Sequence, residues 1–524
     1  MSEFAPLEPW SKGETLKLER KLWQKFPRSS KPEFFLLALI AAVSAWLWLH
    51  LFAPIFQTGF MADDSIFLAV SPPSLHDIAN WFLVPVDDSG YYRPFSRVLW
   101  SLMSAMGATT PGEFQIATLC LLFGAGFFLF LGLKSVHSNL SLAVAGSVAF
   151  VFSLAHAKSL FWITVWFNTA SAFFASATFA FFCMAAKSGS VWQRRAGLVC
   201  LAGAYASNNA MHSMGIVPLA IDFVFLCRYE EESGLSRFRR LLWRAKDHLL
   251  VSASFFLFIY GCGHPFSRTS QFHIHLFDIG NFRGLLGYVT ASFWHPFGDG
   301  PMPAILENPL EVQAVTLGVM ILFVFGFLWD RTFLIFSSLL VGTAFVISLL
   351  HDRWEVEYAA PVALGVAALI SAGLAGVCTL LPLGKKAVSY ALCAGWIYCS
   401  YQFALEGMPA FARDYLRDTS ATAEFMRSIR ELDQKLPRGR VFLFKKMEGP
   451  NLGSAPFGHF MGAAFWEMLP GRAYLLRPGI FISGEGMGMQ DENGSWANEN
   501  LNRAKPYIEI LCGPGGCREG TKSD

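Results

Sequence analysis

The run FFLLALIAAVSAWLWLHLFAPIF, residues 34–56, contains no Asp, Glu, Lys or Arg. An α-helix rises about 1.5 Å per residue, so this run is long enough to cross the ~30 Å hydrocarbon layer of a bilayer. The whole composition agrees, because 53% of the 524 residues are hydrophobic and 15% are charged. These values are typical of a polytopic membrane protein. The sequence therefore predicts an all-α polytopic membrane protein.

Further apolar runs follow, separated by polar connections. They lie near 114–133, 139–156, 160–186, 191–207, 211–228, 248–262, 312–329, 332–350, 358–381 and 387–406. With the first run they predict about 11 transmembrane helices within residues 34–406. An odd number of crossings places the two ends of the chain on opposite sides of the membrane.

Basic residues indicate the orientation. Residues 1–33 are rich in Lys and Arg, and every second predicted connection is basic. The basic connections contain Lys134, then Lys187 with Arg194 and Arg195, then Arg237 to Lys246, then Arg331, then Lys385 and Lys386. Lys and Arg concentrate in cytoplasmic loops. We therefore expect a cytoplasmic N-terminal segment, 1–33, and an extracytoplasmic C-terminal segment, 407–524.

Two adjacent carboxylates, Asp63 and Asp64, follow the first predicted span on its extracytoplasmic side. Carboxylates beside a membrane span are costly unless they face water, a partner or a substrate, which makes the pair a candidate catalytic site. The alternative is a helix cap, because Asp64 precedes Ser-Ile-Phe-Leu and an Asp side chain accepts hydrogen bonds from the first free N–H groups of a helix. A capping role does not exclude catalysis.

The loop 57–97 contains this pair and is interrupted by Pro72-Pro73, Asp87-Asp88 and Gly90. Its apolar residues suit short helices that lie in the membrane interface. The loop ends in Tyr92-Arg93-Pro94-Phe95, where a planar guanidinium could bind a phosphate. An interfacial anchor is the alternative role for Tyr92.

The predicted topology of 11 spans also places a second set of polar residues on the extracytoplasmic face. The candidate substrate-binding residues in this set are His156, Asn209, His212, Arg353 and Glu357, with Lys158 and Asn208 beside them. Each alone is explained by solvation at the end of a span. His273 and His275 lack a clear third ligand, so no metal site is expected.

After the last span the composition becomes that of a soluble domain. Apolar residues at helical spacing predict a helix over 419–436, and Val441-Phe442-Leu443-Phe444 predicts a strand after the turn at Pro437. The sequence thus predicts a small extracytoplasmic α/β domain in 407–524. Its glycine-rich run 484–488 neither follows a clear strand nor opens a clear helix, so it does not indicate a dinucleotide site. Cys512 and Cys517 predict a small disulfide loop in an oxidising compartment.

With these residues in order, the chain resembles the GT-C superfamily of integral-membrane glycosyltransferases, in particular the branch of protein O-mannosyltransferases and bacterial lipid A aminoarabinose transferases. The resemblance covers roughly residues 30–400, and Ala62-Asp63-Asp64-Ser65 followed by Tyr92-Arg93-Pro94-Phe95 is its most specific part. It implies that Asp63 is the general base, with Asp64 as its neighbour or substitute. The chain departs from the pattern around His156 and His212.

The resemblance implies an inverting transfer of a sugar from a polyprenyl-phosphate donor to a lipid, glycan or protein acceptor. The carboxylate takes the acceptor's proton while the lipid phosphate leaves, and Arg93 or Arg353 stabilises the phosphate charge. No cofactor is required, although some members use a divalent cation. The expected location is the bacterial inner membrane. The sequence contains no polybasic tract of the kind that indicates nucleic-acid binding.

Two other classes fit part of this pattern. A lipid or solute transporter also has many spans, but its ionisable residues lie near mid-membrane in broken helices, often with repeat symmetry. Here the ionisable residues lie at one end of the spans and no repeat is evident. A non-catalytic, degenerate member of the superfamily is the third reading, favoured by the departures at Lys158 and His212.

Overall fold

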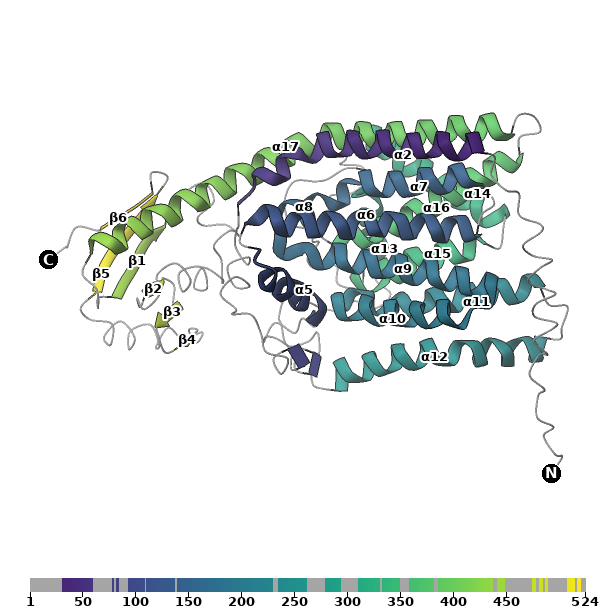
Figure 1. Cartoon of the computed structure of the whole chain (residues 1–524), viewed down its shortest axis with the longest axis horizontal. Helices are drawn as coiled ribbons and strands as arrows, with labels where there is room; N and C mark the ends of the chain where they lie inside the picture. The colour runs from purple at the N-terminus through teal and green to yellow at the C-terminus, as the bar shows by residue number, and fades with distance from the viewer. Residues whose placement is uncertain are drawn as a thin grey trace, which may run out of the picture.

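The structure of the protein is a computed structural model. It describes residues 31–59, 78–79, 82–83, 93–108, 110–136, 139–229, 234–261, 279–293, 310–329, 332–348, 358–380, 385–436, 441–447, 474–476, 480–483, 486–488, 507–513 and 516–519. The described part is mostly helical (Figure 1).

The helices form an elongated bundle with the sheet beyond one of its ends (Figure 1). We call the two ends of the bundle the sheet end and the far end. The α-helices are α2 (Lys31–Phe52), α5 (Pro94–Ala105), α6 (Pro111–Val136), α7 (Leu140–Phe152), α8 (Ala157–Phe161), α9 (Trp166–Ser188), α10 (Val191–Ser207), α11 (Ile216–Tyr229), α12 (Gly234–Gly261), α13 (Ile279–Thr290), α14 (Leu310–Trp329), α15 (Phe333–Ser348), α16 (Ala359–Leu380) and α17 (Lys385–Lys435). Short 3-10 helices are η1 (Ala53–Gln57), η2 (Leu154–His156), η3 (Ile163–Val165) and η4 (Asn209–Gly215).

Four stretches of the described helices are long and apolar enough to cross a membrane. They are Ala38–Gln57, Pro111–Val136, Ile163–Ser188 and Ala359–Cys378. A fifth crossing arises if Leu140–Phe152 and Leu154–Phe161, which are bent by 41° at their junction, form one broken span. Shorter apolar helices are Met211–Leu226, Leu310–Val324 and Phe333–Phe345. The structure therefore supports an integral membrane protein.

The bend after α7 has a local cause. Ser153 is extended, and its hydroxyl accepts a hydrogen bond from the backbone N–H of Ala155 while donating to the backbone oxygen of Ser292 at 3.0 Å. A serine that binds the backbone in this way competes with helical hydrogen bonding. The chain consequently turns through η2, α8 and η3 at the sheet end before α9 begins.

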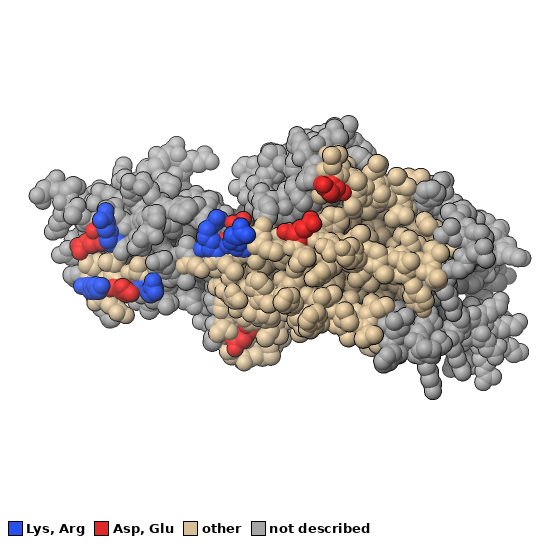
Figure 2. All heavy atoms as spheres, turned by 90° about the horizontal axis from the view of Figure 1, so that it is seen from above, with Lys and Arg blue, Asp and Glu red and all other residues tan. Residues whose placement is uncertain are grey.

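Helix α17 is a single helix of 51 residues that lies beside α2 and extends past the bundle to the sheet (Figure 1). The predicted boundary between residues 406 and 407 therefore falls inside a helix. Residues 387–405 carry no charge, whereas the helix after Glu406 is rich in charge. Figure 2 shows the same contrast, because the Lys and Arg side chains visible on this face lie toward the sheet and not over the bundle. The uncharged part is about 28 Å long at 1.5 Å per residue, close to one hydrocarbon layer.

A sheet of six strands follows α17 in the sequence. The strands are β1 (Val441–Met447), β2 (Tyr474–Leu476), β3 (Ile480–Ser483), β4 (Gly486–Gly488), β5 (Tyr507–Gly513) and β6 (Gly516–Glu519), in the order β4-β3-β2-β1-β5-β6. β1 is parallel to β2 and β5, and the other pairs are antiparallel. β6 packs on α17. The expected helix over 419–436 is part of α17, and β1 contains the predicted strand.

The sequence showed no clear strand before the glycine-rich run 484–488, but in the structure strand β3 precedes it. β3 ends at Ser483, and β4 pairs antiparallel to β3. An antiparallel hairpin does not present a helix N-terminus to a phosphate.

Candidate functional site

Arg93 directly precedes α5 and lies at the sheet end. Its guanidinium donates a hydrogen bond of 2.8 Å from Nη2 to the hydroxyl of Tyr358, and its Cζ lies 3.5 Å from the centroid of the Phe167 ring. A guanidinium on an aromatic face with one fixed hydrogen bond has few alternative orientations. α5 begins at Pro94, whose missing N–H costs nothing at a helix start. This arrangement fixes a cation at the point where the loop 57–97 returns to the bundle.

The start of the same loop is fixed by a second contact. Thr58 donates a hydrogen bond of 2.7 Å to the backbone oxygen of Ile55, and Gln115 of α6 donates to the Thr58 hydroxyl. Thr58 and Gln115 are both buried. A Cβ added at Gly59 would lie 3.5 Å from that of Thr419, so α17 passes close to this point. Both ends of the segment that contains Asp63 and Asp64 are therefore held against the bundle.

The first turn of α9 brings polar side chains into the interior next to Phe167. Asn168 is fully buried, and its Oδ1 accepts a hydrogen bond of 2.7 Å from Nδ2 of Asn208, which follows α10. This bond joins the sheet-end termini of two helices. Thr169 is also fully buried.

Lys158 and His156 occupy the bend between α7 and α9. Lys158 is buried, and its Nζ lies 5.2 Å from the centroid of the Trp162 ring. His156 is fully buried, its Nε2 lies 2.8 Å from the backbone oxygen of Phe150, and its ring packs edge-on against the Phe150 ring. These contacts make His156 part of the packing that supports the bend.

His212 lies in η4, at the same end of the bundle. Its ring packs at 5.7 Å from that of Tyr205, whose hydroxyl lies 2.7 Å from the hydroxyl of Ser252 on α12. Neither ring nitrogen of His212 makes a hydrogen bond in the described part of the chain. Asn209 begins η4.

Several buried polar atoms near α8 and the start of α9 make no hydrogen bond within the described residues. They are Oγ of Ser159, Nε1 of Trp162, Nδ2 of Asn168 and Oγ1 of Thr169. Buried polar groups in proteins are normally satisfied. All four atoms belong to the segment 159–169.

The other predicted site residues lie outside the described residues. They are Asp63, Asp64, Tyr92, Arg353 and Glu357. Two of them are next to residues of the Arg93 contact in the sequence. Tyr92 directly precedes Arg93, and Glu357 directly precedes Tyr358, the hydrogen-bond partner of Arg93. Within the described residues, no group of three or more His, Cys, Asp or Glu side chains could hold a metal ion.

Sequence reasoning missed three residues of this cluster: Phe167, Asn168 and Tyr358. Asn168 and Thr169 stand near the start of the long apolar run 160–186, where polar residues are unusual, and this signal was available in the sequence. Phe167 and Tyr358 carry no such signal, because aromatic residues are common at the ends of spans. Their pairing with Arg93 follows from tertiary structure alone.

Comparison with known proteins finds similar solved structures, among them two of ArnT. The crystal structure of ArnT from Cupriavidus metallidurans bound to undecaprenyl phosphate is 14% identical and matches over 91% of this chain and 92% of that chain, with a TM-score of 0.49. The crystal structure of the same protein in the apo state is also 14% identical and matches over 91% and 93% of the two chains, with a TM-score of 0.46. ArnT is a lipid A aminoarabinose transferase of the GT-C superfamily. No family model and no curated protein matches the sequence. At this distance the roles of residues have to be argued from the chain itself.

Proposed function

We propose that the chain is a membrane glycosyltransferase of the GT-C type, which moves a sugar from a polyprenyl-phosphate donor to a lipid, glycan or protein acceptor at the sheet end of the bundle. The observation that carries this proposal is the contact of Arg93 with Phe167 and Tyr358, which we call the Arg93 cluster. It holds a fixed guanidinium at the sheet end of a bundle with several candidate spans, where the loop that contains the aspartate pair returns to the bundle.

Arg93 binds the donor phosphate in this proposal. Tyr358 and Phe167 hold the guanidinium in place, and a planar guanidinium is the type of group that binds a phosphate through paired hydrogen bonds. Lys158 adds a second cation at the same end. Positive charge that is already in place stabilises the negative charge that develops on the departing phosphate.

Asp63 is the general base, with Asp64 as its neighbour. It takes a proton from the acceptor hydroxyl or amine as that atom attacks the anomeric carbon, while the sugar–phosphate bond breaks on the other side. One displacement of this kind inverts the anomeric configuration. The buried polar atoms of Asn168 and Trp162 supply hydrogen-bonding groups for the sugar.

The proposal includes the topology. The eleven predicted apolar runs correspond to α2, α6, α7, α9, α10, α11, α12, α14, α15, α16 and α17, and we propose that all of them cross the membrane. The sheet end is then extracytoplasmic, where polyprenyl-phosphate sugars are presented. The charged part of α17 and the six-stranded sheet stand above this face and are positioned to hold the acceptor.

Donor binding by the purified full-length protein tests the proposal. Arg93→Gln should weaken the binding of polyprenyl phosphate by about 10- to 100-fold, because charge-assisted hydrogen bonds contribute about 1.5–3 kcal/mol. Arg417→Gln is the matched control, since Arg417 is an exposed arginine on the charged part of α17. Equal binding by wild type and the Arg93 variant would overturn the role of Arg93. Profiles of glycolipids and glycoproteins from cells with and without the chain then identify the transferred sugar.

A further inference from the structure

The far end of the bundle carries a second group of cations, which the proposed transfer reaction does not use. Arg195 of α10 and Arg239, Arg244 and Lys246 of α12 are all exposed. Two tryptophans lie among them on the same helices, Trp192 with 74% and Trp243 with 70% of its surface exposed. We call these six residues the basic face.

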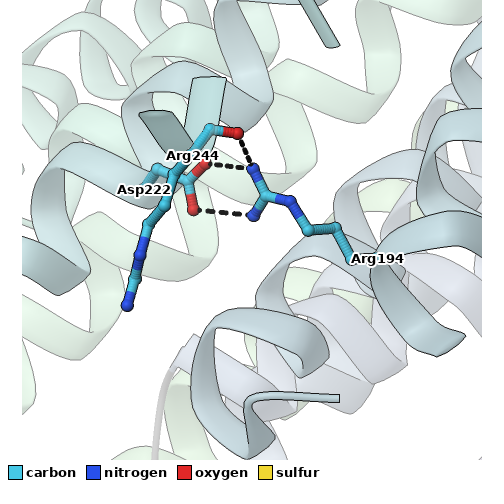
Figure 3. A network of polar contacts seen from close by, with 3 residues as sticks. All are labelled: Arg194, Asp222 and Arg244. Carbon is cyan, nitrogen blue, oxygen red and sulfur yellow. Dashed lines mark hydrogen bonds and ion pairs between the residues drawn. The ribbon is translucent and has the colours of Figure 1, made fainter. Parts of the chain in front are cut away.

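Arg194 links α10 to α11 through an ion pair and to α12 through a backbone hydrogen bond (Figure 3). Arg194 of α10 donates two hydrogen bonds, of 3.1 and 2.8 Å, to the carboxylate of Asp222 on α11, which is almost fully buried. Arg194 also donates to the backbone oxygen of Arg244 on α12. In Figure 3 the side chain of Arg244 points away from this pair. The ion pair therefore neutralises Arg194 and fixes the backbone from which Arg244 projects outward.

The helical spacing places the basic face on the outside of the bundle. Trp192, Arg195 and Val199 are exposed at intervals of three and four residues on α10. On α12 the exposed residues Arg239, Trp243 and Lys246 have the same spacing, and Nζ of Lys246 lies 3.5 Å from the centroid of the Trp243 ring. Side chains at such spacing share one face of a helix.

Along α12 the exposed side chains change from basic to apolar. Asp247 is the only acid on the exposed part of α12 between Phe238 and Leu250 that the structure describes. Beyond His248 the exposed side chains include Leu249, Leu250, Phe256 and Leu257. Such a change marks the depth at which the hydrocarbon layer meets the headgroups. If α12 enters the hydrocarbon layer at this change, the basic face lies at headgroup depth.

We propose that the basic face is a binding site for an anionic phospholipid of the membrane leaflet at the far end of the bundle. Arg195, Arg244 and Lys246 bind the lipid phosphate, and the exposed indoles of Trp192 and Trp243 lie among the headgroups and glycerol backbones. Four cations against one acid favour a negatively charged lipid over a zwitterionic one. The fixed positions of α10 and α12 make this a defined site. It is separate from the donor site at the sheet end.

Native mass spectrometry of the purified full-length protein tests this inference, with phosphatidylglycerol and phosphatidylcholine as lipid probes. Wild type should bind phosphatidylglycerol more tightly than phosphatidylcholine. The triple variant Arg195→Gln, Arg244→Gln, Lys246→Gln should lose about 100-fold of its phosphatidylglycerol affinity, since each basic residue near a membrane surface contributes about 1 kcal/mol. Its affinity for phosphatidylcholine should stay unchanged. Glycerol phosphate in solution should not compete, because it lacks the acyl chains that the apolar part of α12 contacts.

The matched control removes three cations from the sheet side instead: Arg413→Gln, Arg417→Gln, Arg427→Gln, all exposed on α17. This variant should bind phosphatidylglycerol like wild type. An equal loss in both triple variants, or no loss in either, would overturn the proposal, and so would effective competition by glycerol phosphate. If the far-end triple variant does not fold, the single variants Arg195→Gln and Lys246→Gln replace it, and each should lose about fivefold. Unchanged affinity in both single variants would also overturn the proposal.

Discussion

Arg93 differs from an ordinary interfacial arginine in how its side chain is held. An anchor at headgroup depth keeps its rotamer freedom and reaches toward water. Arg93 instead lies on the Phe167 ring and bonds to Tyr358, residues that are 74 and 265 positions away in the sequence. Such a contact stabilises one orientation of the guanidinium before any ligand arrives. This is the property that electrostatic catalysis requires.

The aspartate pair gives a prediction at the residue scale. Asp63→Asn keeps the shape and the capping oxygen of the side chain but removes its ability to accept a proton. If Asp63 is the general base, transfer should fall by about 10²–10⁴-fold while expression stays normal. The measurement is the initial rate of sugar transfer by Asp63→Asn and by wild type, at equal protein levels in membranes.

The alternative role of the pair, a helix cap, predicts a different result for the same substitution. Asn is among the best capping residues, so Asp63→Asn would then leave activity close to wild type, while Asp63→Ala would cost about 1 kcal/mol of local stability. Transfer that survives both Asp63→Asn and Asp64→Asn would remove the aspartates from the mechanism.

Single residues in the sequence predict only part of the candidate site. Arg93 was predicted to bind a phosphate because it ends the loop 57–97 beside aromatic residues; the structure places it at the sheet end, and its role stays a prediction. His156 was predicted from its place near a span end, but it packs fully buried against Phe150. Charge and position in the chain are visible in a sequence. The direction in which a side chain points at a bend is not, because here it depends on how Ser153 turns the chain.

Among the elements, α15 and α16 pack closely at one glycine, and this gives a second prediction. A Cβ at Gly365 would lie 2.7 Å from the backbone nitrogen of Leu340 and closer still to its Cα. Backbone cannot move aside as a flexible side chain can, so Gly365→Ala should destabilise the protein by about 1–3 kcal/mol through overpacking. Thermal unfolding in detergent measures the change.

Gly318 of α14 provides the matched control. A Cβ there would meet nothing within 4 Å, so Gly318→Ala should leave stability unchanged or raise it by up to about 1 kcal/mol through helix propensity. A similar unfolding temperature for the two variants would mean that α15 and α16 separate easily and that the close approach contributes little.

The β5–β6 hairpin carries a third prediction, a Cys512–Cys517 disulfide. The backbone register places the two cysteines directly opposite each other on adjacent antiparallel strands. Opposite residues in such a pair have Cα atoms about 4.5–5.5 Å apart, within the range of disulfide geometry. Mass spectrometry of unreduced peptides should therefore show a loss of two hydrogens. Two alkylatable thiols in protein from intact cells would contradict the bridge and weaken the extracytoplasmic placement of the sheet.

Helices were predictable from the sequence to the extent that hydrophobicity defined them. Each predicted run contains a described helix, but the run near 139–156 breaks at Ser153, and four described stretches, or five with the bent pair, are long and apolar enough to cross a membrane. At residue 406 the composition changes while the helix continues to Lys435. Leaving the membrane changes which side chains are favourable and does not by itself end a helix. Short strands such as β2 and β4, with three residues each, depend on their neighbours in the sheet and left no clear pattern.

At the scale of the whole molecule, charge separates the two ends. The basic face and the Arg194–Asp222 pair lie at the far end, whereas the Arg93 cluster and the charged part of α17 lie at the sheet end (Figure 1). Positive charge is retained on the cytoplasmic side during insertion. The far end has exposed Arg and Lys on both α10 and α12. The charge distribution therefore predicts that the far end is cytoplasmic.

Reporter fusions test this orientation. A reporter that is active only outside the cytoplasm should be inactive when fused after residue 240, in the basic part of α12, and active when fused after residue 450, beyond β1. A cytoplasmic reporter at the same two positions should give the opposite pattern, which controls for expression. Equal activity of one reporter at both positions would contradict an odd number of crossings between α12 and the sheet. The proposed topology has five crossings between the two fusion points, in α12, α14, α15, α16 and α17.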